Sequence, residues 1–195
     1  MSTKNGQKIM SRERIIKLTT TALMLALALI LSFIKVYEMP QGGSITAVSM
    51  MPIILIAYLY GTKWGIFTGF AYSLLQLITD FSSLRGLSIG TFVAAIFLDY
   101  IIAFSVLGLA GMFKDKFKNK ALEITLGTII AVTLRFFAHF LSGFLLWSAY
   151  AEDMNPILYS LVYNGSYMLP ELIITTIFSS IIILILMPIL KKYRT

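Results

Sequence analysis

The sequence alternates between long uncharged, apolar runs and short segments that carry most of the charges, prolines and loop residues. A helix satisfies its own backbone hydrogen bonds, so a run of about 20 apolar residues is typical of a membrane-spanning helix. The second and third runs are short and are separated only by residues 61–63, which predicts a tight helical hairpin. We therefore predict six membrane-spanning helices, near 18–34, 47–61, 64–79, 88–112, 124–148 and 157–190.

The composition supports a membrane protein. Of the 195 residues, 58% are hydrophobic and only 13% are charged, whereas about a quarter of an ordinary soluble chain is charged. Six helices use roughly 120 residues, which leaves no room for a separate domain. The first run is long for a signal peptide and no small-residue cleavage site follows it, so we expect it to be retained. The predicted fold class is an all-α integral membrane protein, with one six-helix bundle at 18–190 between basic segments at 1–17 and 191–195.

The basic residues predict the orientation of this bundle. With six spans, thirteen of the 16 Lys and Arg residues fall on one side, while only Lys35 and Arg85 fall on the other. Cytoplasmic loops are enriched in Lys and Arg, so both termini are predicted to be cytoplasmic, and the net charge of +7 reports topology rather than nucleic-acid binding. The longer outer connections, 35–46 and 149–156, are the natural positions for a gate over a binding site.

Four ionisable residues lie within the predicted spans: Asp99, Arg135, His139 and Glu171. Such groups are costly at membrane depth, so each is a functional candidate that should face the interior of the bundle. With His139 neutral, their formal charge sums to one negative charge, which favours a cationic or amine-bearing ligand. For Arg135 we expect a structural ion pair with Glu171 or Asp99.

The fifth span carries a stripe of residues four positions apart: Arg135, His139, Gly143 and Trp147. Residues at this spacing share one face of a helix. A flat heteroaromatic ligand could stack on Trp147 while His139 supplies a hydrogen bond. The alternative is that Trp147 belongs to the interfacial aromatic belt and that His139 is an ordinary contact between helices.

Two further spans contribute candidates. Asp99 and Tyr100 interrupt an otherwise apolar run, although Asp99 could instead be a structural partner of Arg135. Asn155 followed by Pro156 predicts the start of the last helix. Three tyrosines and an asparagine in its first turns predict a polar lid or wall, or else an ordinary aromatic belt: Tyr159, Tyr163, Asn164 and Tyr167.

Several chemistries have no support in the sequence. There is no G-x-x-x-x-G-K-[ST] loop for ATP, no H-E-x-x-H and no G-x-S-x-G, and the chain has no Cys and one His. We therefore expect no catalytic residue, resident metal or cofactor. The first hypothesis is a small-molecule binding or transport subunit, and the rival is a membrane enzyme that uses Asp99 and His139 as acid and base. A stand-alone ion-coupled carrier usually shows two related halves, which are not visible here.

Three stretches resemble one known family. They are RFFAHFLSGFLLWSAYAEDMNPILYSLVYNGSYMLPE, AIFLDYIIAFSVLGLAGMF and ALMLA. They are similar to the thiamine-specific substrate-binding (S) components of energy-coupling factor (ECF) transporters, the ThiT-type family, and the likeness runs from about Thr19 to Leu190. The resemblance implies a six-helix protein of the bacterial plasma membrane that binds thiamine near the outer surface. It also implies a transmembrane coupling subunit and two ATPase subunits as partners, with ATP used by those partners.

The same resemblance implies roles for individual residues. Ala22 and Ala26 match the face that packs on the coupling subunit, and Gly43 stands at about the position where some members carry a Trp in the first outer loop. A related vitamin or a pyrimidine precursor remains an alternative ligand. The residues that match the family's thiamine pocket are Asp99, Tyr100, His139, Trp147, Tyr159 and Asn164.

Overall fold

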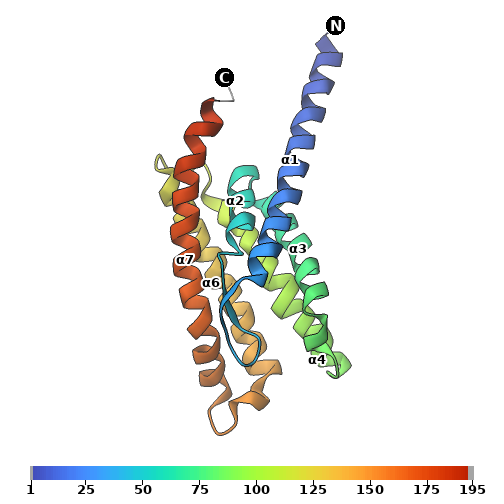
Figure 1. Cartoon of the computed structure of the whole chain (residues 1–195), viewed down its shortest axis with the longest axis vertical. Helices are drawn as coiled ribbons and strands as arrows, with labels where there is room; N and C mark the ends of the chain where they lie inside the picture. The colour runs from blue at the N-terminus through green and yellow to red at the C-terminus, as the bar shows by residue number, and fades with distance from the viewer. Residues whose placement is uncertain (1, 193–195) are drawn as a thin grey trace.

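The computed structural model describes the backbone of residues 2–192 and the side chains of residues 12–189. Its helical segments fall on the six predicted runs (Figure 1). Two short 3-10 helices, η1 (Phe81–Leu84) and η4 (Ser148–Ala151), lie in the connections. The main helical segments are α1 (Ser2–Phe33), α2 (Met51–Tyr60), α3 (Thr62–Thr79), the continuous segment Ile89–Phe113, α6 (Lys120–Leu146) and α7 (Pro156–Lys192).

Local sequence signals account for several helix starts. Asn119 caps α6 because its Oδ1 accepts hydrogen bonds from the backbone N–H groups of Ala121 and Leu122, at 3.0 and 3.2 Å. Asn155 does the same for α7, where Oδ1 lies 2.9 Å from the N of Ile157. The predicted start of the last helix at Pro156 is thereby confirmed. Such side-chain caps satisfy backbone donors that a helix cannot pair internally.

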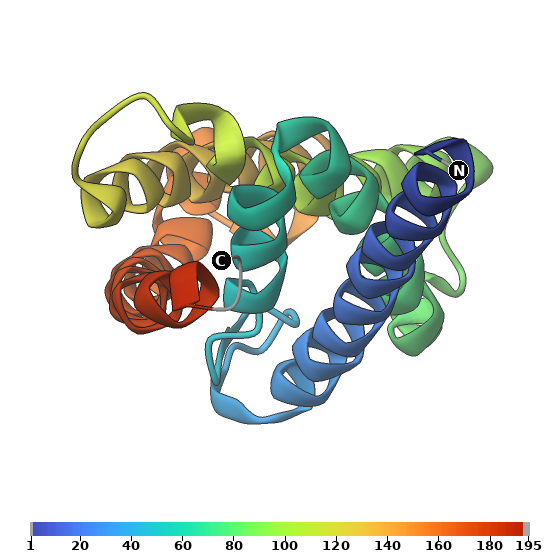
Figure 2. The same cartoon turned by 90° about the horizontal axis from the view of Figure 1, so that it is seen from above.

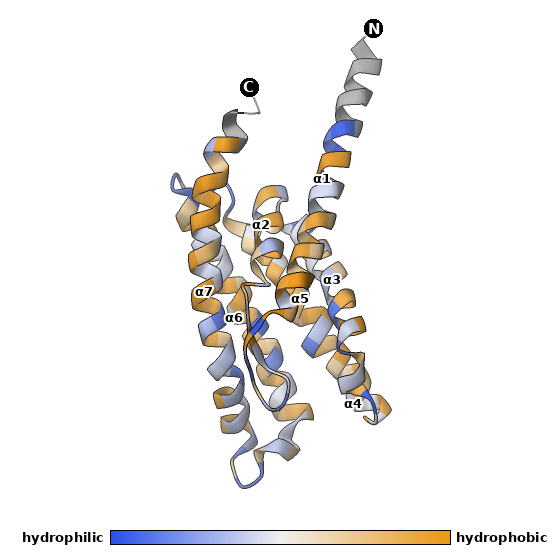
Figure 3. Ribbon diagram, viewed as in Figure 1, coloured by the Kyte–Doolittle hydropathy of each residue, from blue (hydrophilic) through white to orange (hydrophobic). Residues whose placement is uncertain are grey.

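The two ends of the bundle differ in what they carry. Both termini lie at one end in Figure 1, the end that also holds the connection 114–119 before α6. The opposite end holds the connection 80–88 after α3 and the connection between α6 and α7. Between the ends many helical residues are hydrophobic, as the ribbon in Figure 3 shows, and large side chains of α7 such as Ile173 and Ile177 are each 51% exposed. A surface of this kind is suited to lipid rather than water.

The second predicted span is shorter than expected. The run 47–61 predicts a membrane-spanning helix, but α2 has only ten residues, or about 15 Å of helix, half the thickness of a hydrocarbon core. Every residue from Ile53 to Tyr58 is at most 2% exposed. Its apolar character therefore reflects burial in the centre of the bundle rather than contact with lipid. Four helical segments of the described chain are long and apolar enough to cross a membrane: Arg12–Phe33, Ile89–Phe113, Lys120–Leu146 and Pro156–Ile189.

The connection between α1 and α2 is ordered. Strands β1 (Lys35–Glu38) and β2 (Ser44–Thr46) form an antiparallel hairpin, so the all-α expectation misses one small sheet. The turn contains Gly42 with a φ of +92°, a conformation that glycine adopts without a steric penalty. Figure 2 shows the hairpin between α1 on one side and α7 on the other. It thus joins two helices that are distant in the sequence.

The segment Ile89–Phe113 is not a uniform α-helix. It begins as α4 (Ile89–Ala95), widens into the π-helical segment η2 (Ile96–Ile102), passes through α5 (Ala103–Ser105) and ends as the 3-10 helix η3 (Val106–Phe113). Asp99 and Tyr100 both lie in the π-helical part. Single turns of π-helix are rare and are frequent at functional sites.

Candidate ligand-binding site

A cavity of about 660 Å³ lies between the hairpin, the π-helical segment, α6 and α7. Its lining includes hairpin residues 40–44 and Asp80 from the connection after α3. Small-molecule sites commonly measure about 300–1,000 Å³. The structure brings all six residues of the predicted pocket, together with Arg135 and Glu171, to the lining of this one cavity: Asp99, Tyr100, His139, Trp147, Tyr159 and Asn164.

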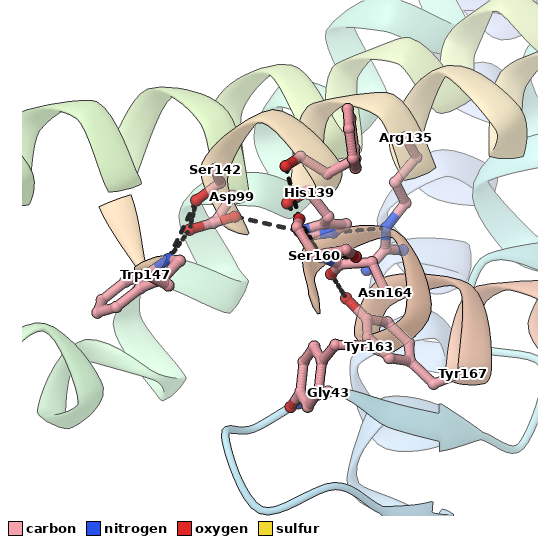
Figure 4. A network of polar contacts seen from close by, with 11 residues as sticks. Gly43, Asp99, Arg135, His139, Ser142, Trp147, Ser160, Tyr163, Asn164 and Tyr167 are labelled. Carbon is pink, nitrogen blue, oxygen red and sulfur yellow. Dashed lines mark hydrogen bonds and ion pairs between the residues drawn. The ribbon is translucent and has the colours of Figure 1, made fainter. Parts of the chain in front are cut away.

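Asp99 is the centre of a polar network (Figure 4). Its Oδ1 lies 3.1 Å from Nδ1 of His139. Its Oδ2 accepts hydrogen bonds from Oγ of Ser142 at 2.6 Å and from Nε1 of Trp147 at 3.2 Å. The carboxylate is 19% exposed and the imidazole 13%. The acid and the two rings expected to contact a ligand are therefore held together as one unit.

The hydrogen bonds of His139 define its tautomer. Nε of Arg135 can only donate, and it lies 3.3 Å from Nε2 of His139, so this ring nitrogen accepts. The proton then resides on Nδ1 and is donated to Asp99, as expected when the partner of one ring nitrogen determines the state of the other. The imidazole is thus neutral and links a cation to an anion.

Arg135 does not make the expected ion pair. Among the residues whose side chains are described, no carboxylate of Glu171 or Asp99 lies within 4 Å of the guanidinium nitrogens. Its guanidinium instead stacks over the ring of Phe104, with 4.2 Å between the Cζ atom and the ring centroid. The hydrogen bond to His139 and this cation–π contact stabilise the buried charge in place of a carboxylate.

Glu171 connects α7 to the hairpin. Its Oε1 accepts hydrogen bonds from the backbone N–H of Thr46 and from the hydroxyl of Thr46, the latter at 2.7 Å. The residue is 3% exposed, and its Oε2 has no hydrogen-bond partner within residues 12–189. Glu171 therefore anchors the end of β2, and its second carboxylate oxygen is buried without a partner among the described residues.

Tyrosines from the start of α7 form one wall. The rings of Tyr159 and Tyr163 are stacked, with centroids 5.7 Å apart and an interplanar angle of 19°. Tyr167 packs edge-on against Tyr163 at 5.9 Å. A Cβ added to Gly43 would lie 2.5 Å from Cε1 of Tyr167, so the hairpin approaches this wall more closely than a side chain at position 43 would permit.

Asn164 is held in place by both helices of the α6–α7 pair. Its Nδ2 donates to the backbone oxygen of His139 at 3.3 Å and to that of Ser160 at 3.0 Å. Its Oδ1 accepts from the hydroxyl of Tyr167 at 2.8 Å. Tyr100, on the other side of the cavity, is 8% exposed. Both residues therefore lie at the cavity wall with little side-chain freedom.

The lining carries more negative than positive charge. Its carboxylates are Glu38, Asp80, Asp99 and Glu171, and its cations are Lys35 and Arg135. With His139 neutral, the formal charge is two negative. An acidic cavity with aromatic walls favours an aromatic ligand that carries a positive charge.

Ala22 and Ala26 lie elsewhere. Both are exposed on α1 and neither lines the cavity.

The sequence reasoning missed several parts of the site. Nothing in the sequence marks Ser142 as part of a site except its position three residues after His139, because serine is common in apolar helices. Thr46 and Gly43 fall in the predicted connection 35–46, and nothing local in the sequence indicates their contacts with α7. The spacing of Tyr159, Tyr163 and Tyr167 did predict a common wall, although only Tyr159 was assigned to the pocket.

An apolar helical bundle with a polar, aromatic cavity toward one end defines a multi-pass membrane protein that accommodates a small ligand. Comparison with known proteins narrows the class. The family model described as "Thiamine transporter protein (Thia_YuaJ)" matches residues 18–192. The chain belongs to this thiamine transporter family.

Individual relatives agree with this assignment. The thiamine transporter ThiT of Bacillus subtilis (strain 168) is 33% identical over 181 residues, which cover 85% of this chain and 88% of the relative. ThiT of Lacticaseibacillus paracasei is 29% identical, with 85% of each chain covered. A solved structure of ThiT from Listeria monocytogenes superposes with a TM-score of 0.72 at 28% identity, covering 87% of this chain and 93% of that one. The helical arrangement is therefore that of a known membrane transport fold.

Proposed function

We propose that this protein binds thiamine in the 660 Å³ cavity and serves as the substrate-binding component of a vitamin uptake transporter. The observation that carries the proposal is the cluster of Asp99, His139 and Trp147 at the cavity wall. Thiamine has a permanently cationic thiazolium ring and an aminopyrimidine ring. An acid and an indole supply the charge attraction, hydrogen-bond acceptor and stacking surface that these two rings need, and the neutral imidazole orients the acid.

The six pocket residues have different roles in binding thiamine. Asp99 attracts the positive charge or accepts from the exocyclic amine, and Trp147 offers its face for stacking. His139 is already fixed by Arg135 and Asp99, so it orients the acid rather than exchanging a proton. Tyr100, Tyr159 and Asn164 complete the enclosure from the π-helical segment and from α7.

The hairpin is the gate in this proposal. It contacts α7 at two places, through Gly43 to Tyr163 at 3.1 Å and through Thr46 to Glu171. Breaking the first contact frees the tip, while the second is buried and holds the base. Thiamine enters from the end that carries the hairpin when the tip swings away, and the contact with Tyr163 re-forms over the bound ligand.

Energy is proposed to come from partners. The resemblance to S components implies a transmembrane coupling subunit and two ATPase subunits, which drive reorientation of the bundle and inward release. Ala22 and Ala26 would face the coupling subunit, and their exposure on α1 is consistent with such a contact. The excess of Lys and Arg near the termini supports cytoplasmic termini in a bacterial plasma membrane.

A titration with thiamine tests the ligand. The chain has two Trp residues, so Trp64→Phe leaves Trp147 as the single indole probe at the cavity. Thiamine should quench its fluorescence with saturation at or below micromolar ligand. Hydroxymethylpyrimidine, which lacks the cationic ring, should bind at least about tenfold more weakly if the acidic lining contributes as proposed. Preferential binding of the pyrimidine would instead favour a precursor carrier.

A further inference from the structure

Ser142 lies on α6 behind the cavity wall. It is fully buried, at 0% exposure, and it does not line the cavity itself. Its hydroxyl nevertheless contacts two residues that do, Asp99 at 2.6 Å and Trp147 at 3.1 Å. A buried polar side chain that bridges two lining residues can act on a ligand without touching it.

The hydroxyl group suits both contacts at once. A serine has one O–H to donate and two lone pairs to accept with. Oδ2 of Asp99 can only accept from it, and Nε1 of Trp147 can only donate to it, so Ser142 donates to the acid and accepts from the indole. Nε1 also lies 3.2 Å from the same Oδ2. The single indole N–H is therefore shared between the serine and the acid, as Figure 4 shows.

This sharing matters when a ligand arrives. Oδ1 of Asp99 is occupied by His139, so Oδ2 is the oxygen that has to turn toward a cationic or amine-bearing ligand. When it does, the indole N–H loses one of its two acceptors. Ser142 remains as the second acceptor of the indole N–H.

We propose that Ser142 is a positioning residue that keeps the Trp147 ring oriented for stacking while Asp99 is released to the ligand. The inference rests on the proposed binding of thiamine in this cavity. It assigns to Ser142 a role in affinity, separate from simple packing between helices. The fixed ring lowers the conformational cost of binding, because a side chain that is already ordered loses less freedom on contact with a ligand.

A double-mutant cycle separates positioning from packing. Ser142→Ala should weaken thiamine binding about tenfold, because the indole N–H then has no acceptor once Asp99 turns to the ligand. Ser73→Ala is the matched control, since Ser73 is also 0% exposed and donates only within α3, to the backbone oxygen of Phe70. It should leave the affinity unchanged. In a Trp147→Phe background, Ser142→Ala should cost at most about threefold, because the indole N–H is gone.

A second readout follows the ring directly. In the Trp64→Phe background, time-resolved anisotropy reports the motion of Trp147 alone. With thiamine bound, the ring should be more mobile in Ser142→Ala than in the protein with Ser142. The inference would be overturned if Ser142→Ala weakened binding equally with and without the Trp147→Phe substitution, or if ring mobility in the bound state were equal. Failure of the protein with Ser142 to bind thiamine at all would instead overturn the proposed function.

Discussion

The backbone N–H of Gly43 donates to the hydroxyl of Tyr163 across 120 positions of sequence, at 3.1 Å. This bond joins the tip of the hairpin to the first turns of α7 and closes one side of the cavity. It depends on the lack of a side chain at position 43, because a Cβ there would lie 3.2 Å from the same hydroxyl and closer still to Tyr167. A side chain at position 43 would therefore have to displace the ring of Tyr167 for the hairpin to keep this contact.

Substitution of Gly43 by Ala should push the hairpin tip away from the wall. We expect thiamine to dissociate several-fold faster, since the closed state loses its contact, with little change in thermal stability. Stopped-flow fluorescence of Trp147 measures the rate. Gly165→Ala is the matched control, because nothing lies within 4 Å of a Cβ at that position and alanine is favourable in a helix. Equal dissociation rates for the two variants would contradict the role of the tip as a gate.

The base of the hairpin should behave differently from its tip. Thr46→Val removes the hydroxyl that bonds Glu171 and keeps the shape of the side chain. We expect a loss of about 1–3 kcal/mol of stability, because a buried carboxylate oxygen loses a donor. Thermal unfolding in detergent measures it. Thr68→Val is the control, because its hydroxyl is buried but bonds only the backbone of Trp64 within α3. A similar change in both variants would show that the anchor at Thr46 is unimportant.

A substitution at the end of the bundle opposite the cavity should lower the stability of the protein without changing its affinity for thiamine. There the hydroxyl of Tyr58 donates at 2.5 Å to Glu123, which is 0% exposed. Tyr58→Phe removes one donor from this buried acid, so we expect about 1–3 kcal/mol lower stability with unchanged affinity for thiamine. Tyr60→Phe, two residues further on, is the control. A large loss of affinity in Tyr58→Phe would mean that this end of the bundle communicates with the site.

Transport should depend on α1 in a way that binding does not. Ala22→Leu or Ala26→Leu enlarges a small residue on the exposed face of α1, where close approach of another helix needs small side chains. We expect thiamine binding to the purified protein to stay intact and uptake by cells to be lost. Thr19→Leu, one turn earlier on an exposed position, is a useful comparison. Normal thiamine uptake by cells carrying Ala22→Leu or Ala26→Leu would exclude this face of α1 as the partner contact.

The sequence predicted the apolar segments and most of the site because both depend on strong local signals. Six apolar runs predict the helical segments. The ionisable and aromatic residues within these runs predict Asp99, His139 and Trp147 as site residues, and all three line the cavity. The features that the sequence does not predict depend on contacts between segments that are distant along the chain. The ten residues of α2 are apolar because they are buried, and hydropathy alone does not distinguish burial in protein from burial in lipid.

The remaining misses have similar causes. Arg135 was assigned to an ion pair on the basis of charge alone, whereas the fold places Phe104 beneath its guanidinium and His139 beside it. The π-helical turn that contains Asp99 and Tyr100 has no clear signature in an apolar sequence. The hairpin was missed because its strands are only four and three residues long, too short for an alternating pattern to be recognised.

Calorimetric titration of thiamine into the protein and into Asp99→Asn tests the central claim most directly. The substitution keeps the size of the side chain and removes its negative charge, while Asp153→Asn, in the connection between α6 and α7, is the matched control. We predict saturable binding to the unmodified protein and to Asp153→Asn, with affinity at least about 30-fold weaker in Asp99→Asn, as expected for the loss of a buried charged partner. Equal affinity of all three proteins for thiamine would contradict a site centred on Asp99.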